Sequence, residues 1–261
     1  MASSKAIQDR RQFVVKANDL IRKTRYDLTA QQQKIVLFAI SKIRPLDGID
    51  TEYEFSIDEF CEACGLDMDA GGYYYKSIKD DLQKLTERTW CRMPSEDDKE
   101  RISTISWIGD ADILPLRGTI RITFNKKMEP YLFELKNRYT QYRLENVLVL
   151  RSKYAIRLYE ILRSYTTQHA LEYDDVKSVS FTLDELKEVL CLENAYPRWA
   201  DFDRFVIHKA VEEINECAED LHIDYQIMKT GRRVSGVHFT ISTPHIRQLI
   251  DARKEKQKRL K

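Results

Sequence analysis

Apolar residues recur at helical spacing in two pairs of segments, one pair in each half of the chain. In the first half, an apolar residue falls every three or four positions over residues 28–43 and again over residues 73–90. In the second half, the same spacing holds over residues 151–165 and 200–221. This period gathers apolar side chains on one helix face, so we predict an amphipathic helix over each segment.

A short motif occurs twice, ahead of the later helix of each pair. Residues 55–66 (FSIDEFCEACGL) and 181–192 (FTLDELKEVLCL) align without a gap at an offset of 126 residues. Ser56 and Thr182 each stand three positions before a glutamate, the pattern of a capping box, and the phenylalanine before each cap is placed to form a hydrophobic staple. The repeat predicts two copies of one domain, each with a short capped helix at this position.

Strand-like alternation follows the later helix in both halves. The alternating segments are residues 90–93, 101–114 and 119–124 in the first half, and residues 222–229 and 234–242 in the second. A turn at 230–232 joins the last two, and we interpret the polar run 94–100 as a solvated loop. Helix, short helix, longer helix and β-hairpin is the element order of a winged helix. We therefore predict an α+β fold of two tandem winged-helix domains with internal pseudo-symmetry.

These elements divide the chain into four parts. We expect an N-terminal tail over 1–12, a first winged-helix domain over 13–136, a second over 137–246, and a basic C-terminal tail over 247–261. The last of these has seven basic residues against two acidic ones. It either extends as a helix over the second domain or is a disordered, solvated end.

The charge of the chain is nearly balanced, with 43 Lys and Arg against 42 Asp and Glu, so the formal net charge is +1. Residues 1–137 sum to −1 and residues 138–261 to +2. Any binding of nucleic acid must therefore come from a local basic face.

The sequence predicts a cytoplasmic protein that does not enter membranes. Its longest apolar run, residues 35–40, is far shorter than the ~20 residues that span a bilayer, and charges occupy the first residues where a signal peptide would be apolar. The cysteines are odd in number, and we interpret Cys61 and Cys64 as buried, reduced thiols rather than half of a metal site.

The sequence also predicts that the protein is not an enzyme. No two histidines have the His-x-His spacing of metal-dependent strand-nicking initiators, and no phosphate-binding loop is present. We expect no catalytic residues, no metal and no cofactor.

The strongest candidates for DNA contact are in the second half. With Phe202 and its apolar neighbours assigned to the core, the opposite face of the predicted helix presents Asp201, Arg204 and His208, and Arg198 lies just ahead of it. The arginines can bond guanine O6 and N7 or hold phosphates, while Asp201 can accept from cytosine N4 or orient an arginine. The alternative is an ordinary solvated helix face.

The predicted hairpin tip strengthens the DNA-binding interpretation. Lys229, Arg232 and Arg233 surround Gly231, at a position where no core needs a cation. Cations at a hairpin tip suit phosphate contacts beside or within a minor groove.

Further phosphate contacts are predicted at one helix start. Ser152 and Lys153 begin the helix over 151–165, and a helix N-terminus attracts anions. Arg157 either adds another phosphate contact or pairs with Glu160.

The first half offers weaker candidates. Lys76 and Lys79 lie on its second long helix among acidic residues, and we interpret the adjacent tyrosines 73–75 as packing or interface residues. Since this half carries no excess of positive charge, protein contacts are its more favoured role.

Several segments resemble the replication initiator (Rep) proteins of iteron-bearing, theta-replicating bacterial plasmids. The resemblance covers about residues 14–243, in matching order and spacing. The segments that carry it are KANDLI (16–21), YTQYRLENVLVLRSKYAIRLYEILRSY (139–165), FTLDELKEVL (181–190), PRWADFDRFVIHKAVEEIN (197–215) and KTGRR (229–233).

The resemblance implies a second domain that reads direct repeats of double-stranded origin DNA, the iterons, and a first domain that contacts the DNA backbone and forms dimers. Monomers of such initiators open the origin and recruit host DnaA and the replicative helicase, whereas dimers repress their own promoter or couple origins. Asp203 and Phe205 flank Arg204 where relatives often carry more basic residues. The base and wing contacts that the resemblance implies in this chain are Arg198, Asp201, Arg204, Lys229, Arg232 and Arg233.

Two alternatives remain at this point. A tandem winged-helix transcription regulator shares the fold and differs only in its DNA target, and an origin-nicking endonuclease belongs to a different class.

Overall fold

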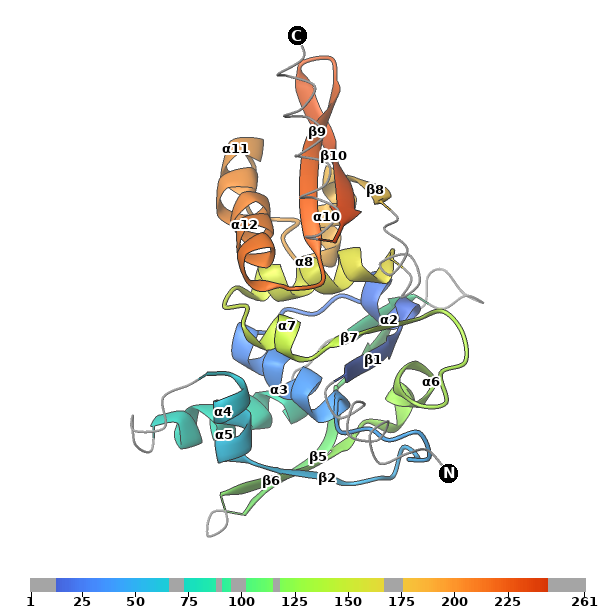
Figure 1. Ribbon diagram of the computed structural model, residues 1–261, viewed down its shortest axis with the longest axis vertical. Coiled ribbons are helices and arrows are strands. Elements are labelled where there is room, and N and C mark those ends of the chain that lie inside the picture. The colour runs from blue at the N-terminus through green and yellow to red at the C-terminus, as the bar shows by residue number, and fades with distance from the viewer. Residues whose placement is uncertain are drawn as a thin grey trace, which may run out of the picture.

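The structure is a computed structural model of the chain, in which two helix–sheet units stack along the long axis (Figure 1). It describes residues 13–65, 73–87, 91–94, 102–114, 118–166 and 176–243. The two predicted tails, and residues 95–100 of the loop expected in the first wing, lie outside this part of the chain.

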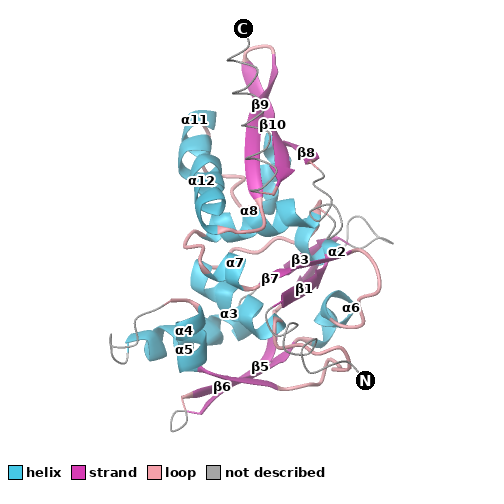
Figure 2. Cartoon of the chain, viewed as in Figure 1, coloured by secondary structure: helices cyan, strands magenta, loops and turns pink. Residues whose placement is uncertain are grey.

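The first unit begins with a short strand and ends with a set of strands, as Figure 2 shows by colour. Its elements are β1 (Phe13–Ala17), α2 (Asn18–Arg22), α3 (Ala30–Ile40), β2 (Tyr53–Ser56), α4 (Ile57–Ala63), α5 (Tyr73–Glu87), β3 (Cys91–Pro94), β4 (Ile102–Ile105), β5 (Ile108–Leu114) and β6 (Thr119–Phe124). A 3₁₀ turn (Lys126–Met128) and α6 (Glu129–Leu132) lead out of it.

The second unit repeats this order. Its elements are β7 (Tyr139–Arg143), α7 (Glu145–Leu148), α8 (Lys153–Ser164), β8 (Lys177–Thr182), α10 (Leu183–Val189), α11 (Trp199–Phe202), a π-helical turn (Asp203–Ile207), α12 (His208–Cys217), β9 (His222–Thr230) and β10 (Arg233–Ser242). The predicted α+β arrangement of two winged helices is confirmed.

Each unit has a three-stranded antiparallel sheet with the second hairpin strand in the centre. The strand orders are β2-β6-β5 in the first unit and β8-β10-β9 in the second. The edge strands β2 and β8 stand directly before the capped helices α4 and α10 and were not predicted, because only four and six residues form them.

A separate two-stranded sheet, β1 with β7, joins the two units. The antiparallel register places Val15 opposite Gln141, which is its equivalent at the same 126-residue offset as the sequence repeat. A residue that faces its own equivalent lies on the axis that relates two copies, because in an isologous contact each partner presents the same surface. The pseudo-twofold axis of the molecule therefore passes through this pair.

The predicted caps are present, but they differ in detail. At α10, Thr182 accepts from the Glu185 N–H at 3.2 Å and the Glu185 carboxylate accepts from the Thr182 N–H at 2.7 Å, which completes the capping box. At α4, Ser56 accepts from the Glu59 N–H at 2.9 Å, whereas the Glu59 carboxylate pairs with Lys42. The box is thus complete only in the second unit.

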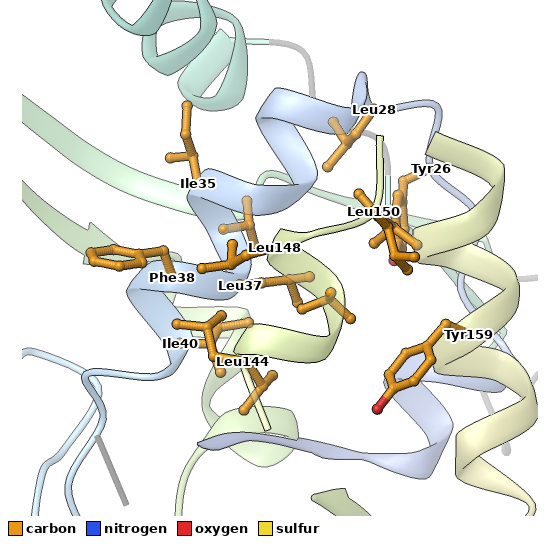
Figure 3. Close-up of a cluster of buried hydrophobic side chains, with 14 of the residues drawn as sticks. Tyr26, Leu28, Ile35, Leu37, Phe38, Ile40, Leu144, Leu148, Leu150 and Tyr159 are labelled. Carbon is orange, nitrogen blue, oxygen red and sulfur yellow. The ribbon is translucent and has the colours of Figure 1, made fainter. Parts of the chain in front are cut away.

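Helix α8 lies between the two units and is buried along most of its length. It packs against α2 and α3 on one side and against α12 on the other. Figure 3 shows part of the shared core, where Leu37 of α3, Leu148 of α7 and Tyr159 of α8 belong to one cluster. Because polar side chains of α8 are buried too, the helix needs hydrogen-bond partners from both units.

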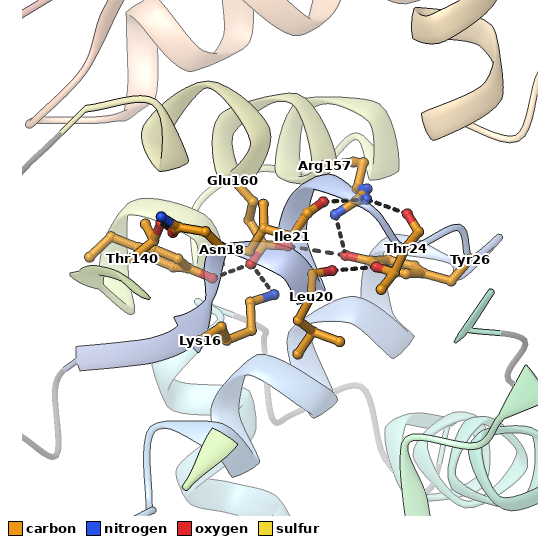
Figure 4. Close-up of polar contacts among 10 residues, drawn as sticks. Lys16, Asn18, Leu20, Ile21, Thr24, Tyr26, Thr140, Arg157 and Glu160 are labelled. Atoms are coloured by element: carbon orange, nitrogen blue, oxygen red, sulfur yellow. Dashed lines mark hydrogen bonds and ion pairs between the residues drawn. The ribbon is translucent and has the colours of Figure 1, made fainter. Parts of the chain in front are cut away.

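Those partners form a buried polar cluster of Lys16, Tyr26, Tyr142, Arg157 and Glu160 (Figure 4). Glu160 pairs with Lys16 and accepts from both tyrosine hydroxyls. Burial alone raises the pKa of the Glu160 carboxyl, but Lys16 and Arg157 outweigh it and hold that pKa below its ordinary value.

Arg157 belongs to this cluster and is not a surface contact. Its guanidinium donates to the carbonyls of Ile21 and Thr24 at 2.7 and 2.8 Å. It also donates to the Tyr26 hydroxyl at 3.1 Å, which in turn donates to Glu160. The pairing of Arg157 with Glu160 is therefore made through Tyr26, and Arg157 is too deeply buried to contact a phosphate.

Candidate nucleic-acid interface

The helix that follows α10 in the second unit consists of α11, the π-helical turn and α12, and we call residues 199–217 the reading helix. Its buried side carries Phe202, Val206, Ala210 and Ile214, as the sequence predicts. The π turn was not predicted, and it is closed by a hydrogen bond from the His208 N–H to the Asp203 carbonyl. Single π turns inside helices often occur at functional sites.

Arg198 and Asp201 form an ion pair at the start of the reading helix. The Arg198 Nε donates to the Asp201 carboxylate at 2.7 Å, and the Arg198 side chain is 80% exposed. An exposed pair of this kind contributes little to stability. Two roles are predicted for Asp201. In the chain without DNA, its carboxylate orients an arginine, Arg198.

Arg204 and His208 are exposed about one and two turns further along the reading helix. The Arg204 guanidinium carbon lies 5.2 Å from the centre of the Phe205 ring. His208 Nδ1 is 3.5 Å from the hydroxyl of Tyr225 on β9. These positions leave Arg204 projecting from the surface and bring His208 beside the hairpin.

The same tyrosine fixes the reading helix against the hairpin. The Tyr225 hydroxyl donates to the Asp203 carboxylate at 2.7 Å, and burial together with this carboxylate raises the pKa of Tyr225. The sequence did not predict this contact, although Tyr225 and Ile223 lie on the same face of the predicted strand. The negative charge beside Arg204 is therefore held by β9.

The β9–β10 hairpin is the wing of the second unit. Its turn holds Gly231 at φ +62°, a conformation that glycine adopts without strain, and the side chains of Lys229, Arg232 and Arg233 are exposed around it. In Figure 1 the wing tip and α11 lie at the same end of the molecule. The structure thus brings the arginines of the reading helix and the wing cations to one end of the second unit.

Ser152 and Lys153 are already engaged within the chain. The Ser152 hydroxyl caps α8 by accepting from the N–H groups of Tyr154 and Ala155 at 3.2 and 3.4 Å. Lys153 pairs with Asp27 of the first unit at 2.7 Å, and this carboxylate raises the pKa of Lys153 against the lowering effect of burial.

A carboxylate occupies the anion position at this helix start. Glu213 of α12 accepts from the backbone N–H groups of Arg151 and Ser152. A phosphate here would compete with Glu213 and Asp27, and the phosphate role of Ser152 and Lys153 stays a prediction.

Lys76 and Lys79 are exposed on α5 of the first unit, away from the reading helix and the wing. The neighbouring Asp81 is buried, which raises the pKa of its carboxyl, and it accepts from Gln32 at 2.9 Å. Tyrosines 73–75 open the helix, but their side chains lie outside the described residues.

Metal-binding clusters and membrane-spanning helices are absent from the described residues. Among them, no cluster of His, Cys, Asp or Glu is arranged to hold a metal ion. Cys61 is a buried free thiol, and burial raises the pKa of the partly exposed Cys64 to about 11. No described helix is long and apolar enough to cross a bilayer.

Two family models match the chain. The model described as "Initiator Replication protein, WH1" matches residues 13–163, and "Initiator Rep protein, WH2" matches residues 182–241. The first match includes α8, which our expected boundary at residue 136 assigns to the second domain. That boundary stays a prediction, and the structure shows α8 in contact with both units.

Two curated relatives come from Escherichia coli. A "Replication initiation protein" is 26% identical over 207 residues, which is 77% of this chain and 61% of the relative. A "PI protein" is 29% identical over 154 residues, which is 53% of this chain and 47% of the relative. The chain therefore spans about three fifths and about half of the lengths of these relatives.

A solved structure has the same fold. The crystal structure of the Pi initiator protein in complex with iteron DNA superimposes with a TM-score of 0.74 at 18% identity, covering 90% of this chain and 98% of that one. The two family matches together take in both helix–sheet units described above. The chain belongs to the initiator replication protein family and contains the WH1 and WH2 winged-helix domains of that family.

Proposed function

We propose that this chain is a plasmid replication initiator that binds iterons, the direct repeats of an origin, in double-stranded DNA. It acts in the cytoplasm by binding and not by catalysis, and it needs no cofactor. The observation that carries the proposal is the set of exposed cations at one end of WH2: Arg198 and Arg204 at the reading helix, and Lys229, Arg232 and Arg233 on the wing. Membership of the family supports it, as does the likeness in fold to an initiator crystallised on iteron DNA.

In this proposal the reading helix enters the major groove by its N-terminal part. Arg204 forks onto guanine O6 and N7, and Arg198 either does the same or holds a phosphate while Asp201 orients it. His208 lies beside the wing, next to Tyr225 of β9. The wing cations contact phosphates on either side of the groove and add affinity without sequence preference, because phosphates are alike along the duplex.

WH1 supplies accessory functions in the same proposal. Lys76 and Lys79 on α5 add contacts to the DNA backbone. Ser152 and Lys153 add further ones when a phosphate displaces Glu213 and Asp27 from the start of α8. WH1 also forms the dimer interface. Monomers open the origin and recruit host DnaA and the replicative helicase, and dimers repress the initiator's own promoter. The near-neutral charge of WH1 supports protein contacts over DNA reading.

The test is to clone the gene with its flanking DNA on a fragment that has no other origin. The wild-type fragment should yield replicating transformants, and the purified chain should retard the flanking DNA in a gel shift. The double variant Arg198→Ala, Arg204→Ala should lose both, since it removes the proposed base contacts. Arg44→Ala, an exposed arginine of a WH1 loop, is the matched control and should retain both.

The other outcomes identify the alternatives. Specific binding without replication would replace the proposal with a transcription regulator. A protein covalently attached to nicked origin DNA would indicate an endonuclease, and the absence of any specific binding would contradict DNA reading altogether.

A further inference from the structure

Phe205 is an exposed aromatic residue on the reading helix. Its side chain is 43% exposed, whereas Phe202, one turn earlier, is fully buried. The buried stripe of this helix runs through Phe202, Val206 and Ala210 and is complete without Phe205. Core packing therefore does not account for a phenyl ring at this position.

The ring is surrounded by positive charge. The Arg204 guanidinium carbon is 5.2 Å from its centre and the Lys209 ammonium is 5.8 Å away, while the Tyr196 ring centre lies 6.3 Å away. The nearby carboxylate of Asp203 is bonded to Tyr225 on β9. The surface thus presents an apolar group between two cations, which suits an anionic partner with an apolar feature of its own.

Duplex DNA supplies that combination in its major groove. The base edges there carry hydrogen-bonding groups, and the 5-methyl group of thymine is the apolar one. An uncharged apolar protein surface would gain from the ring but not from the two nearby cations. Charge complementarity therefore selects DNA as the occupant.

We propose that Phe205 is a specificity-determining residue that contacts the 5-methyl group of a thymine next to the base pair read by Arg204. The inference rests on the proposed function, because it places the same reading helix in the major groove.

The test removes the methyl group from the DNA and leaves the protein intact. The full chain first selects its tightest duplex from randomised DNA. Each thymine of that duplex is then replaced in turn by deoxyuridine, which lacks only the 5-methyl group, and binding is measured by fluorescence anisotropy. For the wild type, one replacement should weaken binding about fourfold, the value for one methyl group removed from a buried contact.

Variants then tie that position to Phe205. With Phe205→Ala or Phe205→Leu, the same replacement should cost less than in the wild type, and with Phe205→Ala it should cost nothing. Leu46→Ala changes an exposed apolar residue of WH1 and should leave the wild-type pattern unchanged. Far-UV circular dichroism checks that each variant is folded.

The results separate the two proposals. Suppose that a duplex is selected and that Arg204→Ala weakens its binding. If every thymine replacement then lowers the affinity of Phe205→Ala as much as that of the wild type, the methyl contact is refuted and the initiator function stands. If no replacement weakens the wild type, the methyl contact is refuted as well. If no duplex is selected, both proposals fail.

Discussion

The buried polar cluster predicts a large effect of a single charge removal. Glu160 is 1% exposed and is the carboxylate that balances Lys16, which is equally buried. Glu160→Gln keeps the size of the side chain but removes the carboxylate charge that stabilises the buried Lys16 and Arg157. Removing one partner of a buried ion pair costs about 3–5 kcal/mol, so we expect a loss of that size in the free energy of unfolding at pH 7. This is a substantial part of the ~5–15 kcal/mol that stabilises an ordinary domain.

Urea unfolding followed by far-UV circular dichroism measures this loss, and a pH series tests its cause. The pKa of Glu160 is lower in the folded chain than in the unfolded one. Its contribution is therefore fully present above the unfolded value of about 4.3 and is lost as the pH falls through the folded value. The difference between wild type and Glu160→Gln should shrink below about pH 4.

Two controls make the result specific. Glu59→Gln removes a carboxylate that also pairs with a lysine but is 49% exposed, and it should cost less than about 1 kcal/mol. Adding Lys16→Met to Glu160→Gln removes both charges of the pair and should cost less than the sum of the two single changes. A loss below about 1 kcal/mol for Glu160→Gln would refute the reasoning, as would a loss that does not depend on pH.

Two further predictions concern the wing and the sheet behind it. Arg232→Ala with Arg233→Ala should weaken binding to all DNA sequences and reduce the slope of log K against log salt by roughly 1–2, measured by anisotropy titrations at several salt concentrations; an unchanged slope would remove the wing from the interface. Gly236→Ala should cost about 1–3 kcal/mol in urea unfolding, because its Cβ would lie 2.3 Å from the Phe181 carbonyl oxygen of β8. Gly48→Ala, with nothing within 4 Å, should be nearly neutral, and equal losses for the two glycines would contradict this account.

Local periodicity was sufficient to predict the main elements. The four amphipathic helices and the hairpins each follow from neighbours within a few positions, and the repeat at an offset of 126 residues follows from comparing two short segments; the structure has all of them. The core of the reading helix, with Phe202 and Val206 buried, follows from the same spacing.

What the sequence did not predict depends on contacts between distant residues. The pairing of β1 with β7 joins residues 126 positions apart, and each strand is too short to stand out by its pattern. The bond from Tyr225 to Asp203 and the pairing of Lys153 with Asp27 likewise arise only when the chain has folded. Arg157 and Glu160 show the same limit, because the sequence left a phosphate contact and a mutual pairing both open for Arg157, and only the fold buries the two residues in one cluster.

The division of labour between the two pseudo-equivalent helices is the central claim, and one comparison tests it most directly. Arg204→Ala in WH2 and Lys76→Ala in WH1 are each titrated against the selected duplex and a scrambled duplex, and the ratio of the two affinities is the measurement. We predict that Arg204→Ala lowers this ratio by about 1–3 kcal/mol in free-energy terms, whereas Lys76→Ala lowers both affinities together and leaves the ratio unchanged. A ratio that falls with Lys76→Ala and stays constant with Arg204→Ala would contradict the account.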